Sequence, residues 1–189
     1  MKNLDEREIS IIREIIKNPK ISDNQISINT KIPTKTVNRK RKHLERENLL
    51  YYFAYLNTWK DGVNLFNTRK LYIIKFREGI TRNQFLENFF IEKGIINIKH
   101  TASMYLGETN GLLALIMLME AKEKEELMEI FNADLIPKIK TIFGEDAIKE
   151  IVSLEITDTL QHLHNYIPRL NITNGIIKND WPDNLIFVT

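Results

Sequence analysis

Apolar residues recur every three or four positions along the first quarter of the chain, a spacing that predicts short amphipathic helices. Leu4–Lys17 carries such a stripe of isoleucines, and it begins with Asp5 and Glu8 at the spacing of a capping box. Ser22 is placed to cap a second, shorter helix, and a third helix is expected over Thr34–Glu47. Three short helices, the last two joined by a tight turn, form the helix-turn-helix pattern.

Beyond residue 68 the pattern changes to apolar strands that alternate with helices. The predicted strands are Lys70–Phe76, Ile95–Leu106, Leu112–Glu120 and Ala147–Thr157. The predicted helices are Thr81–Glu92 and Lys122–Phe131, with a continuation over Leu135–Phe143 after a break at Pro137. The order β-α-β-β-α-β is the ferredoxin-like arrangement. The expected fold class is therefore α+β, with a winged helix-turn-helix domain of three helices followed by a ferredoxin-like domain.

These patterns divide the chain into four parts. Residues 1–50 form the helix-turn-helix domain, and residues 51–68 form a linker in which Tyr51–Leu56 alternates like a strand. Residues 69–160 form the ferredoxin-like domain, whose strands are apolar on both faces, so we expect a homodimer that pairs through the sheet. Residues 161–189 are too apolar for a free tail and are expected to pack on the core or on a partner subunit.

Charge changes this picture by separating the two domains. The whole chain has a net charge of only +2, but residues 1–50 hold twelve basic against seven acidic side chains. The remaining residues hold fifteen against eighteen and are therefore net acidic. A basic segment in an otherwise acidic chain points to a polyanionic partner for the first domain.

The third predicted helix concentrates this positive charge, because Thr34–Lys42 holds five basic residues and no acid. Lys and Arg neutralise phosphates, and Arg, Asn and Thr can also contact base edges in the major groove. Double-stranded DNA is the predicted partner, although a basic face on an ordinary surface helix would give the same pattern. Base contacts are expected from Lys35, Thr36, Arg39 and Lys40, and phosphate contacts from Lys42, His43 and Arg46. Asn38, which lies among the basic residues, is a further candidate for DNA binding.

The residues from Ile26 to Leu50, with the opening LDEREISIIREI, resemble the DNA-binding domain of the Lrp/AsnC (feast/famine) transcription regulators. With the strand and helix order, the resemblance extends over residues 1–157, and it implies a dimeric regulator that binds amino acids or related small effectors. The chain departs from the family pattern at several positions. Lys31 and Asn48 replace glycines, Pro33 replaces a serine cap, and Arg41 stands at a normally aliphatic position, where it would reach DNA or pair with an acid.

The same resemblance places the family's effector loop at Gly107, Glu108, Thr109 and Asn110. Glycine allows close approach of a ligand to the backbone, Glu108 could hold an ammonium group, and Asn110 offers both a donor and an acceptor. Thr109 replaces the family's aromatic residue, which argues against the usual amino-acid ligand. An ordinary polar hairpin turn is an equally good interpretation of this segment.

Other function classes have little support in the sequence. The chain has no cysteine, no phosphate-binding glycine loop and no HExxH motif. His162 and His164 lack an evident third metal ligand, so neither a metal site nor a cofactor is expected. No apolar run is long enough to cross a membrane, and a cytoplasmic location is expected.

Two alternatives to a specific regulator stay open. The first is an architectural DNA binder that needs no effector. The second is an enzyme that resembles the sirohaem decarboxylases, in which His100 and Arg77 would line a tetrapyrrole pocket.

Overall fold

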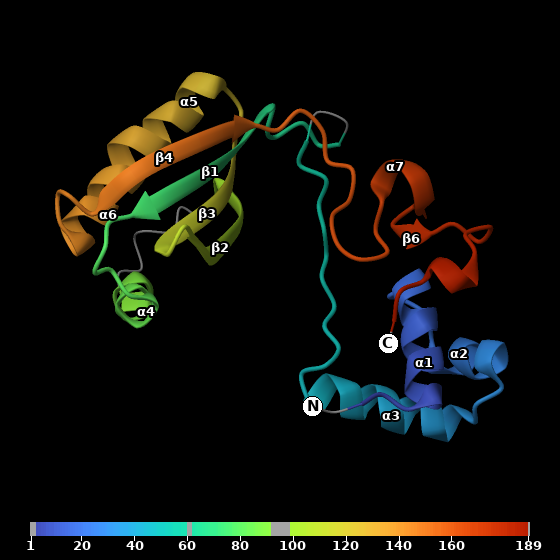
Figure 1. Cartoon of the computed structure of the whole chain (residues 1–189). Helices are drawn as coiled ribbons and strands as arrows, with labels where there is room; N and C mark the ends of the chain where they lie inside the picture. The colour runs from blue at the N-terminus through green and yellow to red at the C-terminus, as the bar shows by residue number, and fades with distance from the viewer. Residues whose placement is uncertain (1–2, 60–61, 92–98, 189) are drawn as a thin grey trace. The chain divides into compact units, whose positions relative to one another are not determined.

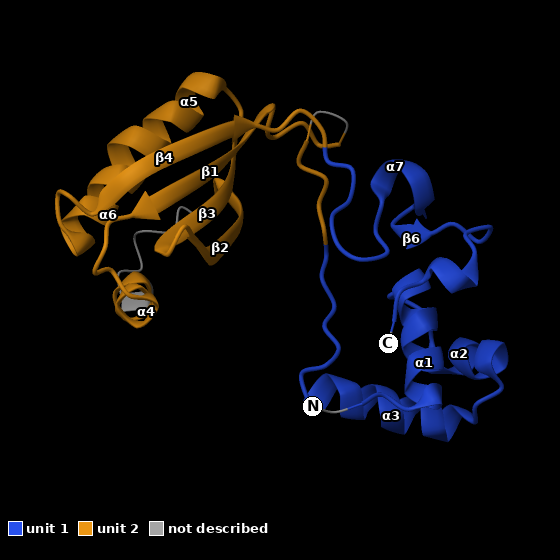
Figure 2. Ribbon diagram, in the orientation of Figure 1, with its two compact units in different colours: residues 1–54, 159–189 blue, residues 55–158 orange. Residues whose placement is uncertain are grey.

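The structure is a computed structural model that describes residues 3–59, 62–91 and 99–188. The chain forms two compact units, which are coloured separately in Figure 2. Unit 1 consists of residues 1–54 and 159–189, and unit 2 consists of residues 55–158. None of the helices in the described residues is long and apolar enough to span a membrane.

Unit 1 begins with three helices, labelled in Figure 1. Their bounds are α1 (Glu6–Lys17), α2 (Asp23–Thr30) and α3 (Thr34–Arg46). Asp5 and Glu8 form the predicted capping box on α1, and the Ser22 hydroxyl accepts a hydrogen bond from the backbone N–H of Gln25 at the start of α2. The three helices share a small apolar core, whose buried members include Ile11, Ile15, Ile26, Ile32 and Val37.

The linker holds no wing strand among its described residues. Residues 49–58 have no regular secondary structure. The side chains of Tyr51, Phe53 and Tyr55 are exposed. The alternating pattern of Tyr51–Leu56 therefore does not produce a strand, and none of the strands in the described residues pairs with it.

The C-terminal segment completes unit 1. It comprises a short helix, a two-stranded hairpin and a 3-10 turn: α7 (Pro168–Asn171), β5 (Ile172–Thr173), β6 (Ile176–Ile177) and η2 (Asp183–Leu185). Strand β6 packs against α1, and Ile177 and Ile186 are buried. The Tyr166 hydroxyl donates a hydrogen bond to the Ile16 carbonyl at 3.0 Å, and Lys17 forms an ion pair with Asp183 at 2.6 Å. These contacts make the segment part of the folded DNA-binding unit.

Unit 2 has the β-α-β-β-α-β order of a ferredoxin-like domain. Its sheet is antiparallel, in the order β2-β3-β1-β4. The elements are β1 (Thr68–Phe76), α4 (Arg82–Ile91), β2 (Thr101–Thr109), β3 (Leu112–Ala121), α5 (Lys124–Glu129), η1 (Ile130–Leu135), α6 (Ile136–Phe143) and β4 (Ile148–Glu155). The fold class expected from the sequence is confirmed. Of the strand expected over Ile95–Leu106, residues 95–98 lie outside the described part of the chain.

Two local predictions in unit 2 are wrong. The helix does not break at Pro137. It continues through the π-helical segment η1, which ends at Leu135, into α6, where Pro137 lies in the first turn and its missing N–H is tolerated. Strand β2 does not stop at Leu106 but runs to Thr109, so Gly107, Glu108 and Thr109 are strand residues and the turn is only Asn110-Gly111.

The sheet has one covered and one open face. The side chains of Tyr72, Ile74 and Phe76 point into a core with Met117 and Phe131, beneath the helix that α5, η1 and α6 form along the sheet (Figure 1). The alternate residues lie on the other face and are only partly buried or exposed. They are Leu71, Ile73, Tyr105, Ile116, Leu118, Val152 and Leu154. No helix in the described part of unit 2 covers this apolar face.

Candidate nucleic-acid interface

Helix α3 is fixed in unit 1 by its apolar side and by the turn before it. Val37 and Leu44 are fully buried, seven residues apart on one face of the helix. Lys31 in the turn has φ 59°, the left-handed conformation that glycine adopts more easily. Asn48, which follows the helix, has φ 54°. The two glycine replacements noted in the sequence therefore both retain a glycine-like backbone.

The opposite side of α3 presents a row of cations. Lys35, Arg39, Lys42 and Arg46 are all exposed, and their spacing of four, three and four residues places them along one helical stripe. In the described part of the chain, Lys35, Arg39 and Lys42 form no ion pair. We call these four residues the basic stripe. A helix with such a row can follow the phosphates that border a DNA groove.

The other two basic residues at the centre of α3 are engaged inside unit 1. The Lys40 ammonium forms ion pairs with Asp5 and, at 3.4 Å, with Glu8, both at the start of α1. Because its side chain is 13% exposed, Lys40 joins α3 to α1 and is not displayed on the stripe. The hydrogen bond from Lys40 lowers the pKa of the Asp5 carboxyl below its ordinary value, and the Glu8 backbone N–H adds to this effect.

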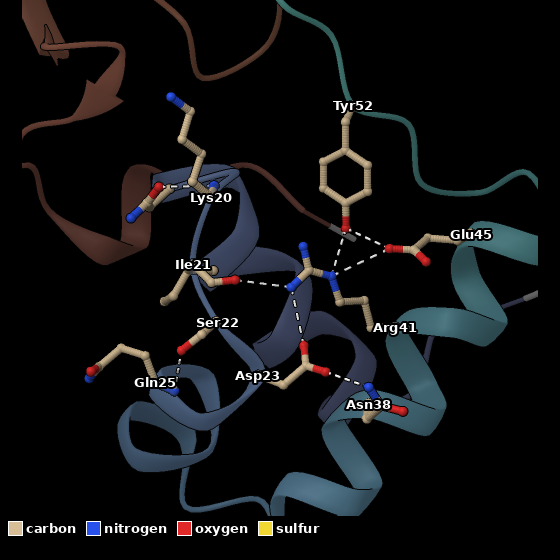
Figure 3. Close-up of polar contacts among 10 residues, drawn as sticks. Lys20, Ile21, Ser22, Asp23, Gln25, Asn38, Arg41, Glu45 and Tyr52 are labelled. Carbon is tan, nitrogen blue, oxygen red and sulfur yellow. Dashed lines mark hydrogen bonds and ion pairs between the residues drawn. The ribbon is translucent and has the colours of Figure 1, made fainter.

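Arg41 pairs with an acid, one of the two outcomes anticipated from the sequence. Its guanidinium donates to Asp23 at 3.1 Å, to the Ile21 carbonyl at 3.0 Å and to the Tyr52 hydroxyl at 2.8 Å (Figure 3). The Tyr52 hydroxyl donates in turn to Glu45 at 2.9 Å. Burial by itself would lower the pKa of Arg41, but its hydrogen bonds with Tyr52 and Asp23 give a net rise.

The remaining predicted DNA-binding residues are partly buried. Asn38 donates from its side-chain amide to Asp23 at 2.7 Å. The His43 ring nitrogen Nδ1 lies 3.1 Å from an Arg46 guanidinium nitrogen. Thr36 lies one residue before the buried Val37. A groove runs along this side of the helix, lined by Lys35, Asn38, Arg39, Lys40, Lys42, His43 and Arg46 together with Glu8 of α1.

Sequence reasoning missed the partners that separate these roles, namely Asp23, Tyr52 and the Asp5–Glu8 pair. One signal was available. At 100° per residue, Lys40 and Arg41 turn away from the line through Lys35 and Arg39, so helical periodicity alone distinguishes them from the basic stripe. Asp23 lies 18 residues from Arg41 in the chain, and Asp5 lies 35 residues from Lys40. No local pattern in the sequence identifies either carboxylate as the partner.

The residues assigned to an effector loop lie in a β-hairpin. Gly107, Glu108 and Thr109 pair with Ala114, Leu113 and Leu112 as the last part of β2. The turn itself is Asn110-Gly111, and both residues have positive φ, as a two-residue hairpin turn requires. The Glu108 side chain is exposed. Gly107 has no positive φ, and a β-carbon added there would make only ordinary contact with Ile116.

The residues of the enzyme alternative are not brought together. His100 is buried at the start of β2, where its ring nitrogen Nδ1 lies 2.8 Å from the Glu120 carbonyl oxygen. Arg77 follows the far end of β1 and pairs with Asp146 at 3.2 Å. The strand register places them at opposite ends of the sheet, eight residues apart along the strand direction and therefore more than about 25 Å apart at the usual rise per residue.

No group of histidines and carboxylates suited to a metal ion occurs within the described residues. The two remaining histidines, His162 and His164, lie in the C-terminal segment of unit 1. The ring of His164 packs against Phe187, with the ring centres 4.9 Å apart.

Comparison with known proteins agrees with this geometry. Residues 4–51 match the model of a winged helix-turn-helix DNA-binding family. No curated protein matches the sequence. Thirty-seven chains of solved structures do match.

Three of these structures illustrate the likeness. A transcriptional regulator of Neisseria meningitidis, solved as an L-Met complex, is 15% identical with a TM-score of 0.62, over 88% of this chain and 97% of the regulator. An AsnC family regulator of Agrobacterium tumefaciens is 11% identical with a TM-score of 0.64, over 84% and 94%. LrpC of Bacillus subtilis is 14% identical with a TM-score of 0.58, over 85% and 99%.

At these identities the likeness shows the fold, and it extends through both units of the chain. It agrees with the resemblance inferred from the recognition helix and the strand order. The protein therefore has a winged helix-turn-helix DNA-binding domain and the two-domain fold of the Lrp/AsnC transcription regulators.

Proposed function

We propose that this protein is a sequence-specific transcription regulator that binds double-stranded DNA as a homodimer and responds to a small effector. The observation that supports the proposal most directly is the basic stripe, an exposed row of four cations on the second helix of a helix-turn-helix. Major-groove insertion of that helix would bring Lys35 and Arg39 to base edges, and Lys42 and Arg46 to phosphates.

The open face of the sheet supports the dimer. Seven apolar side chains there are incompletely covered, and Tyr105 remains 63% exposed. A patch of this kind on an antiparallel sheet is well suited to pairing with a second copy of itself about a two-fold axis. Two copies would carry two recognition helices, which fits an operator with two similar half-sites.

The proposed effector would be a small polar molecule such as an amino acid. The L-Met complex of the Neisseria regulator makes an amino acid a reasonable first ligand to test. Glu108 and Asn110, at the tip of the β2–β3 hairpin, offer a carboxylate and an amide for such a ligand. Ligand binding to the folded chain would raise its unfolding temperature, so a panel of amino acids can be screened by thermal shift.

The central experiment is a fluorescence anisotropy titration of the purified protein with a duplex from its own upstream region. We expect binding that weakens steeply with salt and that exceeds binding to a scrambled duplex by about a thousandfold or more. Equal affinity for both duplexes would favour an architectural DNA binder, and no binding at low salt would rule out both. The enzyme alternative predicts tetrapyrrole binding, which a Soret absorbance titration with sirohaem would detect.

A further inference from the structure

Asn38 lies beside the basic stripe, and the nitrogen of its side-chain amide already donates a hydrogen bond within unit 1. Its side-chain nitrogen donates to Oδ2 of Asp23 at 2.7 Å, and both residues are partly buried. An ionised carboxylate only accepts hydrogen bonds, so the amide nitrogen of Asn38 must face Asp23 and the amide oxygen must face away. Figure 3 shows this arrangement, with the Asn38 oxygen on the side opposite Asp23.

The orientation of Asp23 is fixed in turn by Arg41. The guanidinium donates to Oδ1 of Asp23 and to the Ile21 carbonyl, while its Nε donates to Tyr52. Charge-assisted hydrogen bonds of this kind are stronger than neutral ones and hold their partners in one geometry. Asp23 therefore accepts from Arg41 through one oxygen and from Asn38 through the other, and it cannot rotate without losing both.

The Asn38 oxygen belongs to the surface that would meet DNA. Asn38 lies three residues after Lys35 and four before Lys42, so it shares their side of α3, and it lines the same groove. In the described part of the chain this oxygen accepts no hydrogen bond. A hydrogen-bond acceptor held in this position needs a donor on the base edge.

Base pairs offer few donors in the major groove. They are the amino groups N6 of adenine and N4 of cytosine, whereas guanine and thymine present only acceptors at the corresponding atoms. An asparagine whose amide group can rotate by 180° could present its oxygen to a donor edge or its nitrogen to an acceptor edge. One whose nitrogen is held by a carboxylate keeps its second N–H, but its oxygen cannot exchange places with the nitrogen, so the oxygen is repelled wherever it faces the acceptors O6 or O4.

We propose that Asp23 and Arg41 are positioning residues that hold Asn38 as a hydrogen-bond acceptor, so that it selects adenine or cytosine on the contacted strand. This inference rests on the proposed DNA-binding function and adds the base preference at one position of the operator. It assigns a role to Arg41, which stands where the sequence of similar regulators leads one to expect an aliphatic side chain.

The test is binding-site selection from a random duplex library, followed by titration of the four duplexes that differ at each selected position. We expect one position at which the unmodified protein prefers adenine or cytosine by about tenfold or more. Asn38→Ala should reduce that preference to within about twofold while other positions keep theirs. Asp23→Asn should also weaken it, because the freed amide can turn over. Arg46→Ala is the control and should lower affinity for all duplexes alike.

Circular dichroism of each variant checks that unit 1 is folded, and Arg41→Met provides a second route to release Asp23 if Asp23→Asn unfolds. DNA binding in which Asn38→Ala and the unmodified protein select the same bases overturns the assignment of Asn38 and leaves DNA binding intact. Failure of the unmodified protein to bind any duplex at low salt overturns the proposed function together with this inference.

Discussion

At the scale of single residues, Lys40 and Lys42 show how position on one helix changes what a charge can do. Lys42 is exposed and belongs to the basic stripe, whereas Lys40 lies against Asp5 and Glu8. A lysine already paired with carboxylates releases few counterions on binding DNA, because its charge is compensated beforehand. The two lysines should therefore differ in mutational effect although they are two residues apart.

We predict that Lys42→Ala reduces the slope of log affinity against log salt by about one, the value for one lost phosphate contact. Lys40→Ala should leave the slope nearly unchanged and lower the unfolding temperature, because Asp5 and Glu8 lose their partner. Anisotropy titrations over a series of salt concentrations measure the slopes. Equal slopes for the two variants would contradict the division of roles on α3.

The Asp5–Lys40 pair also predicts a pH dependence. The pKa of Asp5 is lowered from its ordinary value of 3.8 in the folded state. A carboxyl with a lowered pKa stabilises the fold above its ordinary value, and this contribution disappears as the pH falls through the folded-state pKa. Asp5→Asn keeps a capping oxygen and removes the charge. Its unfolding temperature should be below that of the unmodified protein at neutral pH, and the two should converge as the pH falls below 3.8 and through the lowered pKa of the folded state.

At the scale of elements, the backbone conformation of the turn between α2 and α3 lowers the stability of unit 1. Lys31 and Asn48 both have left-handed backbone, but asparagine tolerates that region and lysine does not. Lys31→Gly should therefore stabilise unit 1 by about 1 kcal/mol, whereas Asn48→Gly should change stability by less than about half of that. Thermal unfolding of the two variants gives the comparison. A destabilised Lys31→Gly would show that the lysine side chain contributes more than its backbone costs.

The C-terminal segment gives a second element-scale prediction. Ile186 is buried while its neighbour Leu185 is 52% exposed. Replacing Ile186 with Ala should cost about 2–4 kcal/mol of unfolding free energy, and replacing Leu185 with Ala should cost less than about 1 kcal/mol. Urea unfolding followed by circular dichroism distinguishes the two. Equal small effects would indicate that the segment does not stabilise the helices.

Elements governed by local chemistry were predictable from the sequence, and those governed by distant contacts were not. The capping box of α1, the Ser22 cap and the buried Val37 and Leu44 all follow from spacing alone. The Asn110-Gly111 pair is itself a strong hairpin signal and predicts the two-residue turn, whereas the family resemblance predicts an effector loop over Gly107–Asn110. The partner of Arg41 and the place where the C-terminal segment packs depend on tertiary structure, which no local pattern encodes.

At the scale of the whole molecule, the open sheet face determines the expected assembly. Leu154 lies on that face in the edge strand β4 and is 50% exposed. Leu154→Glu should place charges across the dimer interface and shift the protein to a monomer that binds a two-half-site operator at least tenfold more weakly. Leu160→Glu alters a leucine outside the sheet and serves as the control. Analytical ultracentrifugation measures the molar mass of each variant. A Leu154→Glu variant that stays dimeric would show that the dimer interface lies elsewhere.

The arrangement of unit 1 along the chain has a consequence for how the protein is made. Ile177 and Ile186, which complete this unit, leave the ribosome only after all of residues 55–158 have been translated. At elongation rates of about 5–20 residues per second, the N-terminal helices are synthesised on the order of ten seconds before these two residues. During that interval the uncovered side of α1 is a target for chaperones and proteases. The sheet domain, by contrast, is contiguous and can fold as it emerges.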